Sequence, residues 1–170
     1  SNSFSGAENV VCQIINAFKN DGRFEFVYAS PDGPIREALK DRDIDFEPMA
    51  AATIGEFKRV IHKVKPDIVH AHDMRAGFYA ALVCKNIPLV SHIHNNNFDS
   101  QGISLKSVMY YFAGLKAMHI FWVSKSAYEG YAFHEKFEKK SSILYNVIDS
   151  SAVYKKAAED AKEYAYDIVY

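Results

Sequence analysis

The stretch that decides the fold reads Pro-Asp-Ile-Val-His-Ala-His-Asp at residues 66–73, and its pattern returns as Pro-Leu-Val-Ser-His-Ile-His-Asn-Asn-Asn at residues 88–97. Each stretch is a short apolar run that ends in a pair of histidines, and an apolar segment of small residues lies between them. Two buried strands joined by a helix form a parallel pair, whose carboxyl ends lie at one edge of the sheet. Open α/β folds bind ligands at that edge. The pattern therefore predicts a site lined by imidazoles, and it favours an enzyme.

The composition predicts one globular domain. The chain has 170 residues, of which 49% are hydrophobic and 24% are charged, so it can bury a single core and lacks the polar bias of a disordered protein. Its net charge of −1 gives no field that would gather a polyanion. We therefore expect no nucleic-acid partner.

Cysteine usage and hydropathy bear on location. The two cysteines, Cys12 and Cys84, lie in apolar helical segments, which favours free thiols in a reducing cytoplasm over a disulfide. Charges interrupt every apolar run before the roughly 20 residues that a membrane span needs, and no signal peptide opens the chain. We expect a cytoplasmic protein, with peripheral contact at the inner face of the membrane as a further option.

Helical and strand patterns alternate along the chain. Helices are expected over residues 6–20, 34–41, 53–65, 74–85, 103–116 and 125–136, and strands over 24–29, 44–47, 67–72, 88–93, 119–123 and 142–145. This order predicts the α/β class, with a doubly wound, mostly parallel, Rossmann-like sheet and helices on both faces. Such folds open on a central strand, whereas this chain enters directly into a helix. The first strand is therefore expected to be missing.

The end of the chain predicts a second domain. A polar helix is expected over residues 151–165, and residues 166–170 begin a strand that has no room to develop. We expect a Rossmann-like domain over residues 4–150, with residues 151–170 as a linker helix and the start of an absent domain. A sheet without its first strand has an open slot. We expect residues 164–170 to pair there, in the same chain or by strand exchange in a homodimer.

Five motifs carry a family resemblance. They are Ser-Gly-Ala-Glu at residues 5–8, the first histidine strand at 66–72, the second strand ending at His94, Val-Ser-Lys-Ser at 123–126, and Asn-Val-Ile-Asp at 146–149. Together they resemble the N-terminal, acceptor-side domain of a retaining GT-B glycosyltransferase of the glycosyltransferase 4-like family. Two positions depart from the family pattern. Gly6 stands alone in a normally glycine-rich opening, and Val147 stands where glycine is usual, which disfavours a positive φ.

The resemblance implies an enzyme of polysaccharide biosynthesis that moves a sugar from a nucleotide-sugar to a glycan or lipid-linked acceptor. The family's donor-side signature, two glutamates separated by seven residues, does not occur in this sequence. The nucleotide-sugar is therefore expected to bind a missing domain, and this fragment to hold no cofactor and to be inactive alone. In the mechanism that the resemblance implies, the departing phosphate helps to deprotonate the acceptor, so no pair of catalytic carboxylates is needed.

The same resemblance assigns residues to the site. His94 matches the histidine that the family places near the reacting anomeric centre, and it is expected to be catalytic. The expected substrate-binding residues are Ser5, Gly6, His72, Asp73, Asn95, Asn96, Ser124 and Asn146. Two of these have a simpler alternative role, because Ser5 with Glu8 is a capping-box pattern and Asp73 can cap the helix that follows it.

The histidines leave two other functions open. Residues two apart on a strand project to the same side, so His70 pairs with His72 and His92 with His94. His70 and His92 are expected to be hydrogen-bonded core residues, whereas the other two lie at strand exits and belong to the site. Four imidazoles also suit a metal-dependent hydrolase, although its usual barrel needs more strands, and we expect no metal site. A non-catalytic doubly wound binding module is the second alternative.

Residues 103–121 carry more apolar side chains than one helix face can bury, and Lys106 and Lys116 accompany them. An excess of aromatic and apolar groups flanked by lysines suits a lipid-linked acceptor or a membrane surface. Packing in the core is the simpler interpretation of the same residues.

Overall fold

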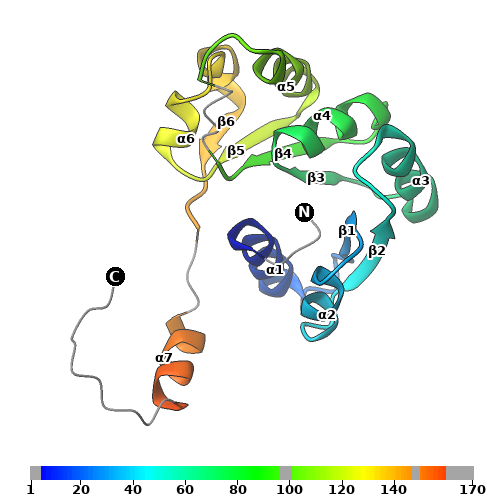
Figure 1. Ribbon diagram of the computed structural model, residues 1–170, viewed down its shortest axis with the longest axis vertical. Coiled ribbons are helices and arrows are strands. Elements are labelled where there is room, and N and C mark those ends of the chain that lie inside the picture. Colours follow the sequence, from blue (N-terminus) through cyan, green and yellow to red (C-terminus); the bar gives the residue numbers. More distant parts are fainter. Residues whose placement is uncertain (1–4, 96–100, 147–149, 160–170) are drawn as a thin grey trace.

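The computed structural model describes residues 5–95, 101–146 and 150–159. Helices and strands alternate along it, as the sequence predicts (Figure 1). The first part of the chain forms α1 (Gly6–Phe18), β1 (Val27–Pro31), α2 (Ile35–Lys40), β2 (Asp45–Met49), α3 (Ile54–Val64) and β3 (Val69–His72). The second part forms α4 (Met74–Val83), β4 (Leu89–Ile93), α5 (Leu105–Lys116), β5 (His119–Trp122), α6 (Lys125–Glu129), the 3₁₀ helix η2 (His134–Lys140), β6 (Ser141–Ile143) and α7 (Ser150–Glu159).

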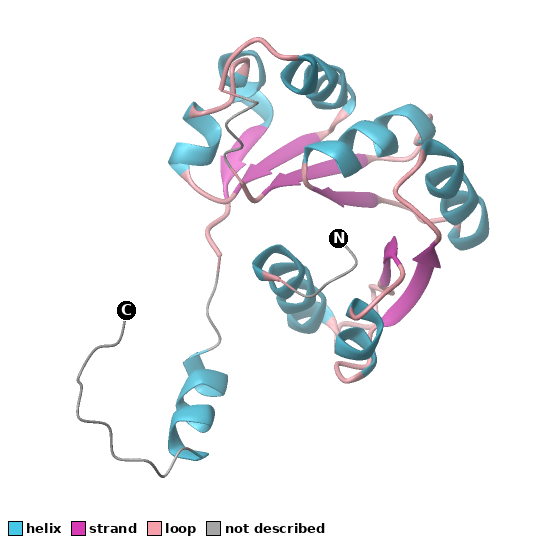
Figure 2. Ribbon diagram, in the orientation of Figure 1, coloured by secondary structure: helices cyan, strands magenta, loops and turns pink. Residues whose placement is uncertain are grey.

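The described strands form two parallel sheets, which Figure 2 shows as separate groups of arrows. β1 pairs with β2, and β3, β4, β5 and β6 lie side by side in chain order. His72 lies opposite His92 in the register of β3 and β4. The predicted α/β class with parallel, Rossmann-like strands is confirmed, while the expected single sheet is divided in two. Within the described residues, β1 and β3 each have a strand on one side only.

A small core holds the first sheet to α1 and α2. Buried Cys12 and Ile15 of α1 contact Ile35 and Leu39 of α2, together with Ile44 before β2. Ion pairs from Glu47 of β2 to Arg59 and Lys63 of α3, each 2.6 Å long, join this sheet to α3. Figure 1 shows α1 and α2 grouped with β1 and β2, apart from α4 and α5.

The largest core lies between the second sheet and the helices that follow its strands. Its fully buried aromatic side chains are Tyr110, Trp122, Tyr131 and Phe137. Their polar atoms are paired: the hydroxyls of Tyr110 and Ser91 are 2.8 Å apart, and the Tyr131 hydroxyl donates to the Ser107 carbonyl at 2.8 Å. Such pairing makes burial of Tyr favourable, because an unpaired hydroxyl would be costly.

Two predicted elements differ from the structure. The strand expected over residues 24–29 lies at Val27–Pro31, because its pairing with β2 places Pro31 opposite Met49. The helix expected over 125–136 is two helices, α6 and η2, separated at Gly130. Phe137 of η2 packs into the aromatic core there, within 6.4 Å of Tyr131 between ring centroids, and this packing redirects the chain.

Some expectations fall on residues outside the described part. α7 confirms the first part of the helix expected over 151–165, while the strand expected over 164–170 lies outside the described residues. Pairing of that strand with the sheet, and dimers made by its exchange, therefore stay predictions. The missing first strand and the division at residue 150 likewise stay predictions.

Candidate active site

Four histidine rings stack on one face of the second sheet, where β3 and β4 end. Ala71, between two of these histidines, packs against α4 on the opposite face. The ring centroids of His70 and His72 are 4.2 Å apart, and those of His92 and His94 are also 4.2 Å apart. Across the strands, His70 and His92 stack at 5.6 Å. The predicted pairing of the histidines on one side is confirmed, and we call the four rings the histidine cluster.

The hydrogen bonds within the histidine cluster are few. Nδ1 of His72 and Nε2 of His94 are 2.8 Å apart, which joins the two strand exits. His92 is fully buried, yet neither of its ring nitrogens has a hydrogen-bond partner within the described residues. Nε2 of His70 and Nδ1 of His94 also lack one there. The expectation of hydrogen-bonded core histidines is therefore wrong for His92, because its neighbours are other imidazoles and Phe121.

Burial keeps the histidine cluster uncharged. It lowers the pKa of His70 to about 4 and that of His92 to about 3, and the charge of His94 acts in the same direction. Burial also lowers the pKa of His72, well below its usual value, and that of His94. Each ring is therefore a neutral imidazole near pH 7, with one N–H donor and one lone pair.

The start of α1 contributes a carboxylate to this region. Ser5 is the N-cap residue of α1, but its hydroxyl donates to the carboxylate of Glu8 instead of capping a backbone amide. The alternative role that the sequence allowed for Ser5, a backbone cap, is therefore absent from the structure. Glu8 is nearly buried, and its charge, after that of Asp73, opposes the lowering of the His94 pKa by burial. Ser5, Gly6 and Glu8 thus lie on the side of the fold that carries His94.

Two predicted site residues cap helices. Asp73 accepts a hydrogen bond from the amide of Ala76 at 2.8 Å and caps α4, with φ at 82°. Ser124 accepts from the amide of Ala127 at 3.0 Å and caps α6. A positive φ is uncommon for a residue other than glycine, and such strain is concentrated at functional sites. The alternative role that the sequence allowed for Asp73 is therefore present in the structure.

The remaining predicted residues lie in loops after the strands. Asn95 follows β4 and Asn146 follows β6, and both are exposed, while Asn96 lies outside the described residues. Sequence reasoning missed two contributors: Glu8, whose charge acts on His94, and Phe121, whose ring lies 5.8 Å from that of His92. Phe121 lies opposite His92 in the register of β4 and β5, and its place in the strand expected over residues 119–123 is the sequence signal that could have found it.

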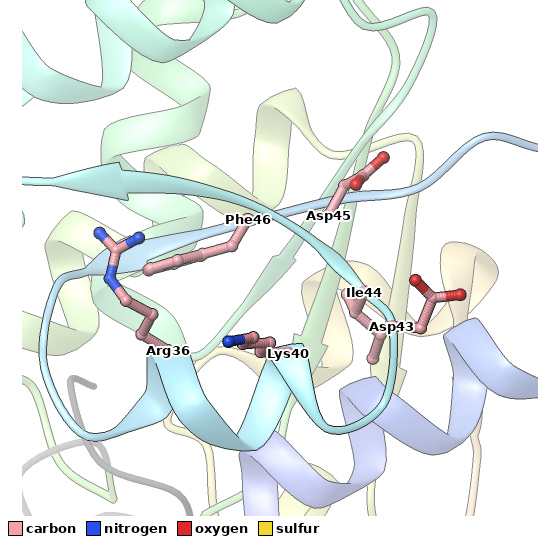
Figure 3. Close-up of a pocket in the computed structure, with 6 residues that line it drawn as sticks. All are labelled: Arg36, Lys40, Asp43, Ile44, Asp45 and Phe46. Carbon is pink, nitrogen blue, oxygen red and sulfur yellow. The ribbon is translucent and has the colours of Figure 1, made fainter.

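A separate hollow lies at the amino end of β2 (Figure 3), and no residue of the histidine cluster lines it. It is lined by Arg36, Lys40, Asp43, Ile44, Asp45 and Phe46. Two of its charged groups are already paired, because Arg36 binds Asp32 at 2.7 Å and Asp43 binds Lys19 at 2.9 Å. The hollow is therefore a weaker candidate than the strand ends.

α5 presents apolar side chains to solvent. Leu105, Val108, Phe112 and Leu115, spaced along one side of the helix, are all exposed, as are Ile103 before it and Met118 after it. The described residues contain no helix with the length and apolar character that a membrane crossing requires.

The sequence matches Glycosyltransferase Family 4 over residues 4–152, and the chain belongs to this family. The comparison with curated proteins returned no match. The fold matches crystal structures of Anabaena Alr3699/HepE in complex with UDP at a TM-score of 0.72, and with UDP-glucose or with UDP and glucose at 0.71. Sequence identity is 16% in each case, and the match covers 93% of this chain and 48% of that chain.

The chain therefore spans about half the length of the solved structures that share its fold. Family and fold together confirm the predicted resemblance to the N-terminal domain of a GT-B glycosyltransferase.

Proposed function

We propose that this chain is the acceptor-side half of a retaining glycosyltransferase, which moves a sugar from a nucleotide-sugar to a glycan or lipid-linked acceptor. Membership of Glycosyltransferase Family 4 supports sugar transfer over a metal-dependent hydrolase or a non-catalytic binding module. The HepE structures hold UDP, UDP-glucose, or UDP with glucose, which favours a uridine diphosphate sugar as the donor. Because the chain covers only about half of HepE, we place the donor in a second domain and expect this chain to be inactive alone.

The observation that carries the proposal is the position of His94. It follows β4 at the carboxyl end of the sheet, is half-buried, and is held through Nε2 by His72. Its Nδ1 is buried and has no hydrogen-bond partner within the described residues. A fixed imidazole with one unused nitrogen at this edge is suited to bond a sugar hydroxyl or a phosphate oxygen.

Charge development explains what His94 contributes. In a retaining transfer the sugar gains oxocarbenium character while negative charge moves to the leaving phosphate, which itself takes the proton of the acceptor hydroxyl. When His72 donates to Nε2 of His94, the neutral ring of His94 carries its proton on Nδ1. That N–H is a preorganised donor, and no catalytic carboxylate is required.

Of the other predicted residues, His72 acts through His94 by holding its ring. We keep Asn95 and Asn146 as proposed sugar contacts, because they are exposed in the loops that follow β4 and β6 at the same edge of the parallel sheet. Ser5 and Gly6 remain proposed contacts at the start of α1.

The exposed side of α5 supports the lipid-linked acceptor of this proposal. Its exposed stripe of Leu105, Val108, Phe112 and Leu115 is apolar and includes an aromatic ring. Lys106 lies beside this stripe, where its charge favours anionic lipid headgroups. A surface of this kind suits a substrate that is delivered from a membrane surface.

The experiment is the His94→Ala variant of the full-length transferase. We expect turnover to fall about 100-fold, the loss typical of one preorganised transition-state donor, while the fold stays intact. His94→Asn should recover part of that loss, because the amide N–H of asparagine replaces the Nδ1–H donor. The control is His62→Ala on the exposed side of α3, which should leave turnover unchanged. Full turnover in His94→Ala would contradict the assignment.

A further inference from the structure

We propose that His70, His72 and His92 form a binding site for one divalent transition-metal ion, with Zn²⁺ as the best match. The site lies within the histidine cluster, one step inside the strands from His94. This inference goes beyond the proposed sugar transfer, which requires no metal ion. It also reverses the expectation from the sequence that the chain has no metal site.

The geometry brings three ligands together. One ring nitrogen from each of His70, His72 and His92 lies within 4.8 Å of the other two. Tetrahedral zinc with bonds of about 2.0 to 2.1 Å to imidazole needs nitrogens about 3.3 Å apart. Small side-chain rotations that close the triangle by about 1.5 Å would therefore complete the coordination. The backbone already fixes the arrangement, because His72 and His92 are register partners on adjacent strands.

The unpartnered nitrogens point to a missing ligand. His92 is fully buried with both ring nitrogens unpaired within the described residues, and Nε2 of His70 is unpaired there too. A buried imidazole keeps one donor and one acceptor, so it needs partners that its neighbours must supply. Its ring neighbours are other histidines and Phe121, which leave a bridging water few additional polar partners. A metal ion would use the lone pairs of all three rings at once.

His94 completes the arrangement as an outer partner. Metal-bound histidines usually donate their second ring N–H to a neighbouring acceptor, which fixes the ring and its tautomer. Nδ1 of His72 lies 2.8 Å from Nε2 of His94, so this bond leaves Nε2 of His72 for the ion. The observed bond is therefore the orienting contact that a zinc ligand needs.

The donor set selects the class of ion. All three ligands are imidazoles, which suit zinc, cobalt, nickel and copper. Magnesium and calcium prefer oxygen ligands, and Mg²⁺ loses its water reluctantly. We therefore expect the site to bind Zn²⁺ and Co²⁺ and not to bind Mg²⁺.

The test is a calorimetric titration of the chelator-treated chain with ZnCl₂. One ion per chain should bind with a Kd of about 1 μM or tighter, whereas MgCl₂ should give no saturable heat. The variants His92→Phe and His70→Phe keep an aromatic ring in the stack and remove the ligand. Each should weaken Zn²⁺ binding about 100-fold or more. The matched control is His119→Phe, which changes a histidine on the same face of neighbouring β5 that is not one of the three proposed ligands. This variant should bind Zn²⁺ as tightly as the wild type.

X-ray absorption is a second measurement, and it needs only the wild-type chain, so it does not depend on whether a buried variant folds. X-ray absorption of the zinc-loaded wild-type chain should show imidazole nitrogens at about 2.0 Å and no sulfur. Absence of saturable zinc binding in the wild type, binding that survives both substitutions, or a first shell of sulfur or of oxygen alone would overturn the proposal. None of these readouts uses transferase activity, so a negative result would leave the proposed function standing.

Discussion

The hydrogen bond between His72 and His94 decides which ring nitrogen carries each proton. Both rings are neutral, so one of them donates and the other accepts. A metal ion on Nε2 of His72 would leave the proton of that ring on Nδ1, and His94 would then accept through Nε2 and present Nδ1–H. The proposed ion would thus fix His94 in the tautomer that the proposed transfer uses.

The sequence predicts the shared face of these histidines, because the strand period of two depends on spacing alone. It does not predict their hydrogen bonds. Those depend on what the neighbouring strand and α1 bring near each ring: here Phe121 lies beside His92, and the charge of Glu8 acts on His94. The same limit applies to Ser5, whose spacing from Glu8 fits a capping box although the two side chains bond to each other.

A single methyl group at Gly114 should test the packing of the aromatic core. A Cβ added there would lie 2.6 Å from Cζ of Phe137, whose ring is fully buried. Overpacking costs about 1 to 3 kcal/mol and outweighs the helix propensity of about 1 kcal/mol gained from alanine. We expect Gly114→Ala to lower the free energy of unfolding by about 1 to 2 kcal/mol in urea titrations.

The control for that substitution is Gly55→Ala in α3, where the nearest atom to the new methyl is Oγ1 of Thr53 at 3.9 Å. Its free energy of unfolding should be unchanged or slightly raised. Equal stability of the two variants would show that Phe137 moves aside without cost.

At the scale of elements, amphipathic patterns and caps predict most helices well. α3 begins after Thr53, whose hydroxyl accepts from the amide of Glu56, and ends at Lys65 in a left-handed conformation before Pro66. Both signals are local in sequence. The break between α6 and η2 is not local, because it depends on where Phe137 enters a core built from α5 and β5.

The link between β2 and α3 should depend on pH. Hydrogen bonds from Lys63 and then Arg59, each 2.6 Å long, hold the pKa of Glu47 below its ordinary value of 4.5. The charged form is therefore favoured in the folded state. Its stabilising contribution is full above about pH 4.5 and is lost as the pH falls through the lower folded-state pKa.

We therefore expect Glu47→Gln to be less stable than the wild type at neutral pH, and the difference to shrink below pH 4.5. Both cations are largely exposed, so solvent and salt should keep the effect modest. Urea titrations at several pH values measure this difference in the free energy of unfolding. The control is Glu25→Gln at an exposed position, which should leave the free energy of unfolding unchanged. A difference that grows on acidification would have the wrong sign.

Across the whole molecule, the alternation of helices with parallel strands was predictable but the division of the sheet was not. Alternation of helices and strands predicts parallel strands joined by helices, and the described strands are parallel. Which neighbours actually pair depends on contacts between distant parts of the chain, and β1 and β3 do not pair with each other. One consequence is that the two sheets have separate cores: the core of the first sheet includes Ile35, and the largest core of the second sheet includes Trp122.

The exposed apolar side of α5 gives the molecule a face that should bind anionic membranes. Flotation with vesicles containing phosphatidylserine should carry the wild-type chain, and neutral vesicles should carry less, because Lys106 favours anionic headgroups. Burying Phe112 and Leu115 in the interface supplies most of the affinity, so Phe112→Ser with Leu115→Ser should weaken binding about tenfold or more. The control is Ile54→Ser with Leu82→Ser, two comparably exposed apolar residues on α3 and α4. If both double variants floated like the wild type, α5 would not be the membrane-facing surface, and the lipid-linked acceptor would lose its structural support.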